Sequence, residues 1–365
     1  MRYLNPLKHI LELKRSHWDR DSFPREARAA FRKMLLCRTR ALGGELFASE
    51  NAQLIVYHTC KSRACPGCGR WATRKWVAAR EAALPRGPYK GITFTMPDVL
   101  WRVFCENRSL VDALPSLAAN AITALVLARH GLQAGIIAVL HTFNGRLEFN
   151  SHVHTMVTAG GRQLSSGKWI RSVYYDRDLL TDLWRTAVLK LLRTALRSGL
   201  LTTKLTRDEA EAMLVEQERW WSVKIQSVNS TEHLLQYSGR YVRRPPIAQY
   251  RIIHIGNKMI RFLSKDKVLK RFVVAECTLE EFIDRWAQHI PRTNQHLVRN
   301  FGLFSPRGVN QTSDEAIGQQ RPPKALVPRW ADSLKQTFGR DPLLDQHGRR
   351  MFWVRQLAAH SELAL

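Results

Sequence analysis

Hydrophobic and polar positions alternate in several short segments of the chain, and this period of two predicts β-strands. The clearest segments are 91–96 (GITFTM), 136–143 (IIAVLHTF) and 147–158 (LEFNSHVHTMVT). Asn144-Gly145 separates the last two and favours a tight hairpin between them. Weaker patterns predict further strands at 221–228, 250–255 and 259–263.

In most of the sequence between these strands, apolar residues recur at the spacing of an α-helix. It predicts helices at 24–36, 111–129, 178–198, 207–217, 230–244 and 278–289. Pro245-Pro246 ends the fifth of these, because proline cannot continue a helix. The chain becomes polar beyond Pro306, and 311–328 is expected to be a flexible linker.

The charge of the chain narrows its possible partners. Lys and Arg number 57 against 31 Asp and Glu, a formal net charge of +26. Such an excess favours a polyanionic partner, either nucleic acid or an anionic membrane. We expect no membrane association, since the apolar stretch around 118–128 is short and the N-terminus lacks a signal-peptide pattern. The expected location is the bacterial cytoplasm, in association with the nucleoid.

Four of the six cysteines fall between positions 37 and 68. In a reducing cytoplasm such thiols serve as metal ligands more often than as disulfides. Cys65-Pro-Gly-Cys68 has the spacing of a zinc knuckle, in which a tight turn brings two thiolates to one Zn²⁺. Cys37 and Cys60 complete a set of four, although His58 competes with either. Four ligands leave no open position, so we expect a structural zinc.

A His-Val-His segment lies within the predicted strand 147–158. His152 and His154 are two positions apart, so both point to one face of the sheet, where they form half of a divalent-metal site. The third ligand is expected from the neighbouring predicted strand: His141 is preferred and Glu148 is the alternative. Mn²⁺ suits two or three imidazoles better than Mg²⁺ does, and phosphate oxygens can complete either coordination sphere.

Two tyrosines lie near the end of the predicted helix 230–244. Tyr237 and Tyr241 are four positions apart and therefore share one helix face. Taken without their neighbours, these two tyrosines would be explained as aromatic side chains that pack on the sheet. Their neighbours Arg240, Arg243 and Arg244 are suited to phosphate, which indicates a catalytic role. A phenol needs a metal that polarises the phosphate and cations that lower its own pKa.

The combination of these motifs resembles the HUH single-strand endonucleases, and within them the two-tyrosine rolling-circle transposases of the insertion-sequence 91 family. The resemblance extends from about residue 25 to 305 and matches nothing after Pro306. Its motifs are AVLHTF (138–143), His152-Val153-His154, 237–244 followed by PPIA, the four cysteines and, more loosely, LVRNFGL (297–303).

This resemblance implies an α+β fold, with a central antiparallel sheet flanked by helices and a small N-terminal zinc domain. The expected domains are a helical and cysteine-rich DNA-recognition domain at 1–88, the HUH nuclease domain at 89–265, and a helical, partly flexible region at 266–365. The metal is expected on the sheet, with the tyrosine helix packed across from it.

The resemblance also implies a reaction. His152 and His154, with His141, hold Mg²⁺ or Mn²⁺ against the scissile phosphate of single-stranded DNA at a transposon end. Tyr237 or Tyr241 attacks it and forms a 5′-phosphotyrosine, which a 3′-OH of the transposon or target DNA later resolves. The expected DNA-binding residues are Arg240, Arg243, Arg244, Arg70 and Lys75.

Other functions stay open at this point. A plasmid or phage replication initiator shares the chemistry and differs only in its DNA. A non-catalytic zinc-dependent DNA-binding regulator accounts for the charge and the cysteines, but not for the histidine and tyrosine motifs. A nuclease that uses three carboxylates is disfavoured, because Asp98 and Glu148 do not group as such a triad.

Overall fold

The computed structural model describes residues 5–81, 84–217, 220–238, 245–265, 271–306, 331, 332, 335, 339 and 341–359. The side chains of residues 70, 71, 232 and 236–238 lie outside this description. The chain forms two compact units. The first contains 1–79, 243–290 and 326–365, and the second contains 80–242 and 291–325. The domain boundaries expected after residues 88 and 265 remain predictions.

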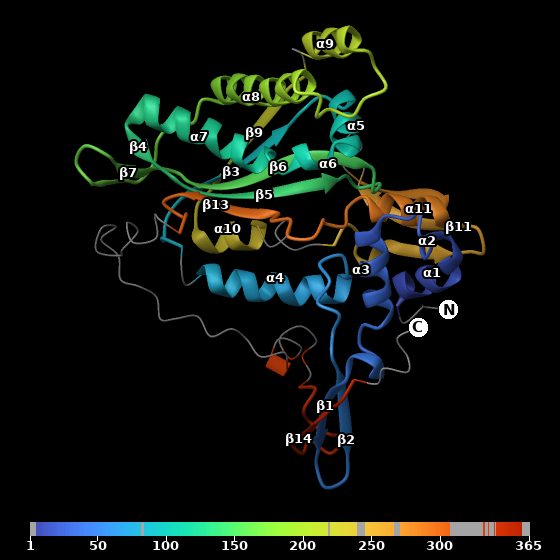
Figure 1. The fold of residues 1–365 in the computed structure, drawn as a ribbon. Coiled ribbons are helices and arrows are strands. Elements are labelled where there is room, and N and C mark those ends of the chain that lie inside the picture. Colours follow the sequence, from blue (N-terminus) through green and yellow to red (C-terminus); the bar gives the residue numbers. More distant parts are fainter. Residues whose placement is uncertain are drawn as a thin grey trace. The chain divides into compact units, whose positions relative to one another are not determined.

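The second unit is built on a five-stranded antiparallel sheet (Figure 1). Its strands, in spatial order, are β13 (Val298–Gly302), β5 (Gly135–Phe143), β6 (Phe149–Thr158), β3 (Tyr89–Thr95) and β9 (Ser222–Val228). The sequence pattern predicted four of these strands, and β13 coincides with the segment LVRNFGL. The chain is thus a mixed α+β protein with antiparallel sheets, as expected.

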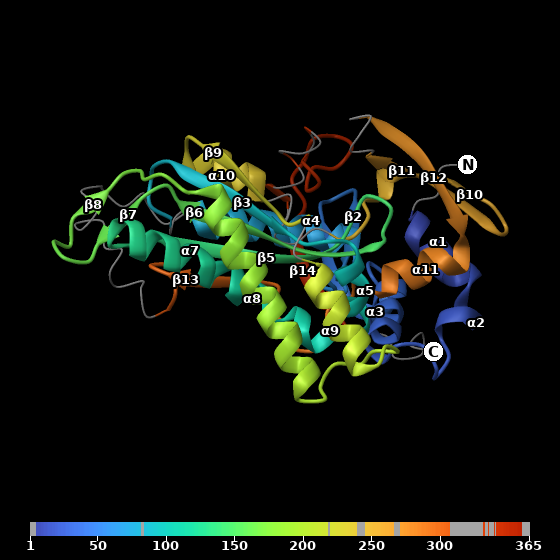
Figure 2. The same ribbon diagram turned by 90° about the horizontal axis from the view of Figure 1, so that it is seen from above.

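One face of this sheet carries the hydrophobic core. Helices α5 (Val99–Glu106), α7 (Leu114–His130) and α8 (Arg177–Arg197) cover it (Figures 1 and 2). Leu140 and Val153 point into this core and are almost fully buried. Asp176 caps the start of α8, and Gly131 ends α7 in the left-handed conformation that glycine adopts readily. Shorter elements complete this side: α6 (Arg108–Val111), β4 (Leu132–Gln133), β7 (Gly161–Gln163), β8 (Trp169–Ile170) and α9 (Arg207–Glu216).

The opposite face of the sheet is approached by α10 (Thr231–Ser238), which lies against β3 and β9 (Figure 1). The Thr231 hydroxyl donates a hydrogen bond to the carbonyl of Pro85 at 3.0 Å, which fixes the start of this helix. Leu234 and Leu235 are buried. The predicted helix 230–244 is therefore present up to residue 238, and residues 239–244 lie outside the described part.

The β5–β6 hairpin has a longer turn than the sequence predicts. Its loop runs from Asn144 to Glu148. The backbone N–H of Asn144 donates a hydrogen bond to the carbonyl oxygen of Glu148 at 3.1 Å. Leu147, expected in the strand, has a φ of +62°. The Asn144 side chain accepts hydrogen bonds from the backbone N–H groups of Arg146 and Glu148. This local network favours a wider turn than a two-residue Asn-Gly turn.

The apolar helix region Arg108–His130 is long and apolar enough to cross a membrane by length and composition alone. Half of its most apolar window is buried inside the protein, where α7 packs on β5 and β6. A core helix passes this test as readily as a membrane-spanning one, so the feature is weak evidence for a membrane span.

The first unit combines helices with two small sheets. Helices α1 (Pro6–Leu13), α2 (Arg15–Trp18) and α3 (Arg25–Leu35) share the unit with the antiparallel strands β10 (Ile252–Ile255), β11 (Met259–Lys265) and β12 (Phe272–Thr278) and with helix α11 (Leu279–Ala287). Phe31 on α3 packs against Trp286 on α11, with ring centroids 5.0 Å apart. Segments far apart in the sequence therefore share one core.

The second sheet of the first unit contains β14 (Phe352–Leu357), β1 (Gly44–Ala48) and β2 (Gln53–Tyr57), in that order (Figure 1). The cysteine-bearing segment continues into helix α4 (Pro66–Glu81). These three strands were not predicted. β14 lies near the end of the sequence and pairs with β1, which lies near its beginning. No local pattern in the sequence predicts a pairing between such distant segments.

Candidate metal centres and the tyrosine helix

Three histidines meet on the face of the five-stranded sheet opposite its helical core. His152 and His154 alternate with the core residue Val153 along β6. His141 on β5 is the direct cross-strand partner of His152. One ligand atom from each histidine lies within 4.8 Å of the others, a spacing that one metal ion can bridge.

The rings form a compact cluster. The ring centroid of His154 lies 4.9 Å from that of His141 and 4.9 Å from that of His152, and each pair of rings is close to perpendicular. His141 is buried and stacks on Phe143, with centroids 5.2 Å apart. His152 and His154 are half-buried. The cluster therefore has a rigid, packed side at His141 and a more exposed side at His152 and His154.

Hydrogen bonds orient two of the imidazoles. Nδ1 of His154 lies 3.0 Å from Oγ1 of Thr93, its cross-strand partner on β3. Nδ1 of His152 lies 2.8 Å from the carbonyl oxygen of Asn150. A partner on one ring nitrogen fixes the tautomer and directs the other nitrogen to a metal. Thr93 was not identified from the sequence, because only the pairing of β3 with β6 brings it to the site.

Burial keeps the pKa of His154 well below its usual range, and the neighbouring charges of His141 and His152 act in the same direction. A neutral imidazole is the form that binds metal. The alternative third ligand, Glu148, lies outside this cluster: it is exposed in the β5–β6 turn and accepts a hydrogen bond from the Asn144 amide at 2.8 Å. The geometry therefore groups His141, and not Glu148, with the His-Val-His pair.

Tyr237 is on α10, and the backbone of this helix lies on the side of the sheet that carries the histidines (Figure 1). The Tyr237 side chain lies outside the described residues. So do Tyr241, Arg240, Arg243 and Arg244. Their roles as nucleophiles and DNA-binding residues remain predictions.

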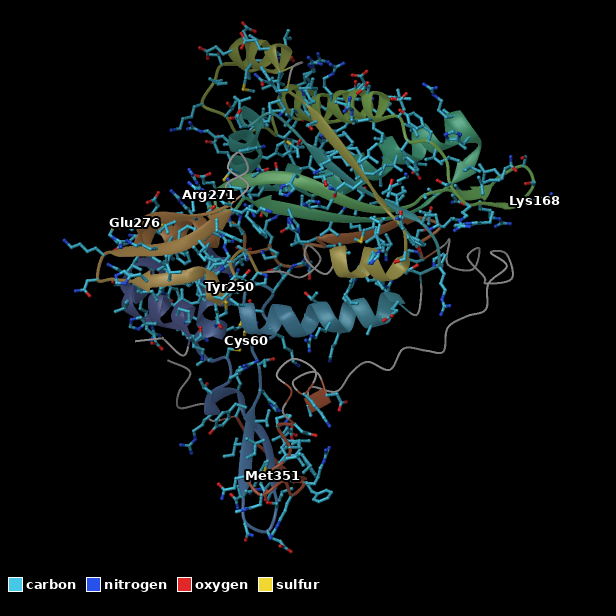
Figure 3. The ribbon with its side chains drawn as sticks, turned by 180° about the vertical axis from the view of Figure 1, so that it is seen from behind. Cys60, Lys168, Tyr250, Arg271, Glu276 and Met351 are labelled. Carbon is cyan, nitrogen blue, oxygen red and sulfur yellow. The ribbon has the colours of Figure 1, made fainter. Side chains whose placement is uncertain are left out.

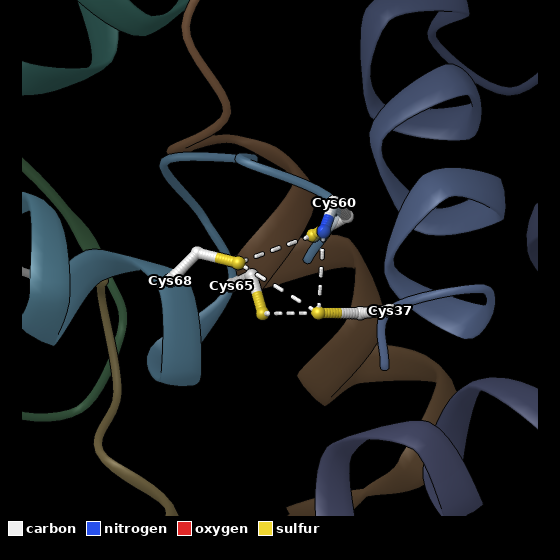
Figure 4. A group of neighbouring side chains, drawn as sticks. All are labelled: Cys37, Cys60, Cys65 and Cys68. Atoms are coloured by element: carbon white, nitrogen blue, oxygen red, sulfur yellow. Dashed lines mark hydrogen bonds between the residues drawn. The ribbon is translucent and has the colours of Figure 1, made fainter. Parts of the chain in front are cut away.

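The second cluster consists of four cysteines in the first unit (Figure 4). Cys37 follows α3, Cys60 follows β2, Cys65 precedes α4 and Cys68 lies in its first turn. Sγ of Cys68 lies 3.7 Å from that of Cys37 and 3.6 Å from that of Cys60, and the Cys37–Cys65 separation is 3.9 Å. Four ligands 2.3 Å from a tetrahedral Zn²⁺ are separated by about 3.8 Å. The cluster thus has the dimensions of a zinc site and not of disulfides.

Hydrogen bonds connect the four thiols and favour the thiolate form at Cys37. The backbone N–H of Cys60 points to Sγ of Cys37 at 3.4 Å. Hydrogen bonds from Cys60, Cys65 and Cys68 lower the pKa of Cys37, which favours the thiolate that zinc binds. His58, the competing ligand, has its ring nitrogens 3.0 Å from a Glu45 carboxylate oxygen and 3.1 Å from the Leu42 carbonyl. It therefore supports the loop and does not belong to the four-ligand cluster.

Comparison with known proteins connects both clusters to one family. A family model described as "Transposase zinc-binding domain", of the IS91 type, matches residues 9–96, which contain the four cysteines. A second, described as "Putative transposase", matches residues 135–312, which contain the three histidines and both tyrosines. The transposase for insertion sequence element IS801 of Pseudomonas savastanoi pv. phaseolicola is 31% identical over 296 residues, 76% of this chain and 70% of that protein. The chain belongs to the IS91 family of transposases.

A further relative supports this membership. The protein described as "Putative transposase y4qJ" of Sinorhizobium fredii is 29% identical over 290 residues, which cover 74% of this transposase and 73% of that protein. No solved structure matches the transposase. The resemblance seen in the sequence is thereby confirmed at the level of the family, and the four cysteines belong to its zinc-binding domain.

The remaining DNA-binding residues predicted for the transposase lie on α4. Lys75 is exposed on this helix, and the Arg70 side chain lies outside the described residues. The helix starts at Pro66, directly after Cys65, and contains Cys68 in its first turn, so two zinc-cluster residues lie at the end of α4 that precedes these side chains. Their contact with DNA stays a prediction.

Proposed function

We propose that this transposase has an HUH endonuclease fold and cuts and rejoins single-stranded DNA at insertion-sequence ends through a 5′-phosphotyrosine intermediate. The observation that carries the proposal is the convergence of His141, His152 and His154 on one face of an antiparallel sheet. The membership of the IS91 family supports DNA strand transfer as the overall reaction.

The position of α10 supports tyrosine as the nucleophile. β9 ends at Val228 beside Tyr89, the first residue of β3. α10 starts three residues later and lies against the same two strands. The six residue steps from Thr231 to Tyr237 rise about 9 Å, and the step from Tyr89 to Thr93 along β3 is about 13 Å. A helix that runs back along β3 brings Tyr237 to within about 4 Å, measured along the strand, of the level of the Thr93–His154 pair.

The proposed chemistry conserves the energy of the phosphodiester bond. The phenolic oxygen of Tyr237 or Tyr241 attacks the scissile phosphorus, the P–O3′ bond breaks, and the departing oxygen takes up a proton as a free 3′-OH. The reverse attack, by a 3′-OH on the phosphotyrosine, restores a phosphodiester and releases the phenol. No nucleotide cofactor is required, because each step exchanges one phosphate ester for another.

The chain's own residues supply binding and positioning. His141, His152 and His154 fit Mn²⁺ or Mg²⁺, which would polarise the phosphate and stabilise the charge of the leaving oxygen. Thr93 and the Asn150 carbonyl hold two of these imidazoles in place. Arg240, Arg243 and Arg244 follow Tyr237 in the sequence and are suited to the flanking phosphates. We propose that the zinc domain contributes recognition of the element's ends in the bacterial cytoplasm.

The test is a cleavage assay with labelled single-stranded DNA from the regions that flank the gene. The protein and Mn²⁺ are mixed with this DNA, and the products are separated on a denaturing gel. We expect a covalent adduct that is lost in Tyr237→Phe, in Tyr241→Phe or in both. His152→Ala should bind the DNA but form no adduct, and Tyr250→Phe, an exposed tyrosine outside the motif, should behave like the unmodified protein.

Three results would contradict the proposal. Binding without an adduct, across several DNA ends and with both metals, would indicate a non-catalytic zinc-dependent DNA-binding protein. An adduct that persists in the double tyrosine variant would assign the nucleophile to another residue. Cleavage at a neighbouring replication origin, and not at element ends, would indicate a replication initiator.

A further inference from the structure

The sheet β14-β1-β2 exposes several large apolar side chains next to one another, which is uncommon on the surface of a soluble monomeric protein. Phe352, Trp353 and Val354 on β14 are 69%, 59% and 49% exposed. Figure 3 labels Met351, the buried residue directly before β14, and Cys60, which follows β2 in the sequence. We call Phe47, Leu54 and Trp353, which are cross-strand partners in one row, the aromatic row.

Trp353 is fixed in place although its ring is exposed. Its indole N–H donates to a Glu45 carboxylate oxygen at 2.7 Å. The other Glu45 oxygen lies 3.0 Å from Nε2 of His58, two residues before Cys60 in the zinc cluster. The hydrogen bond from Trp353, with that from His58, lowers the pKa of Glu45, so the carboxylate stays charged and able to accept both. A rigid aromatic surface is thus offered to solvent at little entropic cost on binding.

Arginines and carboxylates both surround the aromatic row, and the carboxylates of Glu45, Glu50 and Asp341 each have a partner. Residues 346–357 contain three arginines and no acidic residue. Arg349 pairs with Glu50 and Arg350 with Asp341, and the two guanidinium side chains are 51% and 53% exposed. The Arg349–Glu50 pair is exposed on both sides, so it is weak and can exchange for a phosphate contact, whereas the Asp341 side chain of the other pair is only 11% exposed. Arg355 is also exposed on β14.

We infer that the aromatic row binds unpaired bases of single-stranded DNA, with Trp353 as the stacking surface and the neighbouring arginines on the phosphates. An exposed aromatic ring among arginines is the combination that binds single strands without sequence preference. A protein interface would place fewer charges around its apolar centre. Duplex DNA hides the faces of its bases. The inference rests on the proposed function in one respect, namely that the substrate is single-stranded DNA.

Binding is measured on the full-length Tyr237→Phe/Tyr241→Phe protein without added divalent metal, by fluorescence anisotropy of a labelled oligothymidine. Trp353→Ala should weaken binding by about 5- to 100-fold, the range for loss of one stacked base. Trp353→Phe should retain most of the affinity. The matched control is Trp220→Ala, since Trp220 is 87% exposed and lies in the second unit. Zinc content and circular dichroism check that each variant is folded.

A second measurement, photochemical cross-linking, needs no substitution in the sheet β14-β1-β2. The same protein is irradiated with an oligothymidine that contains iododeoxyuridine, and the cross-linked peptide is identified by mass spectrometry. We expect the adduct on Trp353 or Phe47. Adducts found only elsewhere would overturn the inference.

Other outcomes would also overturn it. If Trp353→Ala and Trp220→Ala weaken the binding of single-stranded DNA equally, the aromatic row is not a specific binding site. An equal loss of duplex binding would show that bases are not contacted. Dissociation of an oligomer by Trp353→Ala, with unchanged single-strand affinity, would assign the row to contact between two copies of the chain. Trp353-dependent binding by a protein that never cleaves DNA would contradict the proposed function alone.

Discussion

Thr93 and His154 face each other across the β3–β6 strand pair, with Oγ1 of the threonine 3.0 Å from Nδ1 of the imidazole. This contact places a hydroxyl behind one of the two half-buried rings of the histidine cluster. It fixes the direction of the nitrogen that faces the metal position, so it bears on metal affinity without touching the metal.

Removal of this hydroxyl should weaken divalent-metal binding. Thr93→Val keeps the shape of the side chain but lacks the hydrogen bond to His154, and loss of such a partner costs about 10- to 100-fold in affinity. Titration with Mn²⁺, followed by electron paramagnetic resonance, measures the change. Thr93→Ser should bind nearly as the unmodified protein does. Thr95→Val is the matched control, because Thr95 lies on the same strand but bonds to the Ser222 carbonyl. Equal affinities for all variants would rule out the positioning role.

The identity of the third metal ligand leads to a second prediction. His141→Ala should reduce Mn²⁺ affinity more than Thr93→Val, since it removes an imidazole from the cluster itself. Glu148→Gln should leave the affinity unchanged, because this exposed carboxylate contacts the Asn144 amide in the turn. The same Mn²⁺ titration compares them. The reverse order of effects would restore Glu148 as the ligand.

The zinc cluster should be essential for the folding of the first unit. Cys65→Ser removes one of four thiolates, and structural zinc supplies about 10–16 kcal/mol of apparent binding free energy in small zinc peptides. We therefore expect loss of bound zinc, measured by inductively coupled plasma mass spectrometry, and a lowered first melting transition in calorimetry. Cys105→Ala should keep its zinc, since Cys105 belongs to the second unit. A Cys65→Ser protein that retains zinc and its melting profile would contradict the assignment.

The core of the first unit allows a more quantitative prediction. Trp286 is fully buried and packs on Phe31 and Phe282. Trp286→Ala should lower the free energy of unfolding by about 3–5 kcal/mol, the usual effect of deleting a large buried aromatic ring. Trp286→Phe should lower it much less, because the buried indole N–H has no hydrogen-bond partner among the described residues. Urea denaturation measures both values, and equal losses would show that this N–H has a partner.

Local patterns in the sequence predict much of this fold and both clusters. The strand 91–96 corresponds to β3 and the helix 24–36 to α3. The spacing of His152 and His154 is sufficient to place both on one face, and Cys65-Pro-Gly-Cys68 is sufficient to indicate zinc. These features depend on residues a few positions apart.

What could not be predicted depends on long-range pairing. Thr93 reaches His154 only because β3 inserts between β6 and β9. Trp353 meets Glu45 only because β14 returns to β1. The length of the β5–β6 turn depends on side-chain hydrogen bonds of Asn144, which compete with the two-residue turn that Asn-Gly favours.

The order of segments in the first unit also constrains how the chain is made. The second unit is inserted between parts of the first, and the hydrogen bond from Ser49 to Asp345 joins residues 296 positions apart. During synthesis on the ribosome, β1 and β2 must therefore wait, with one sheet edge unpaired, until β14 emerges. Zinc binding to Cys37, Cys60, Cys65 and Cys68 needs only the first 68 residues. Early metal capture can thus hold the hairpin while translation continues, and a cell short of zinc would expose this edge to aggregation.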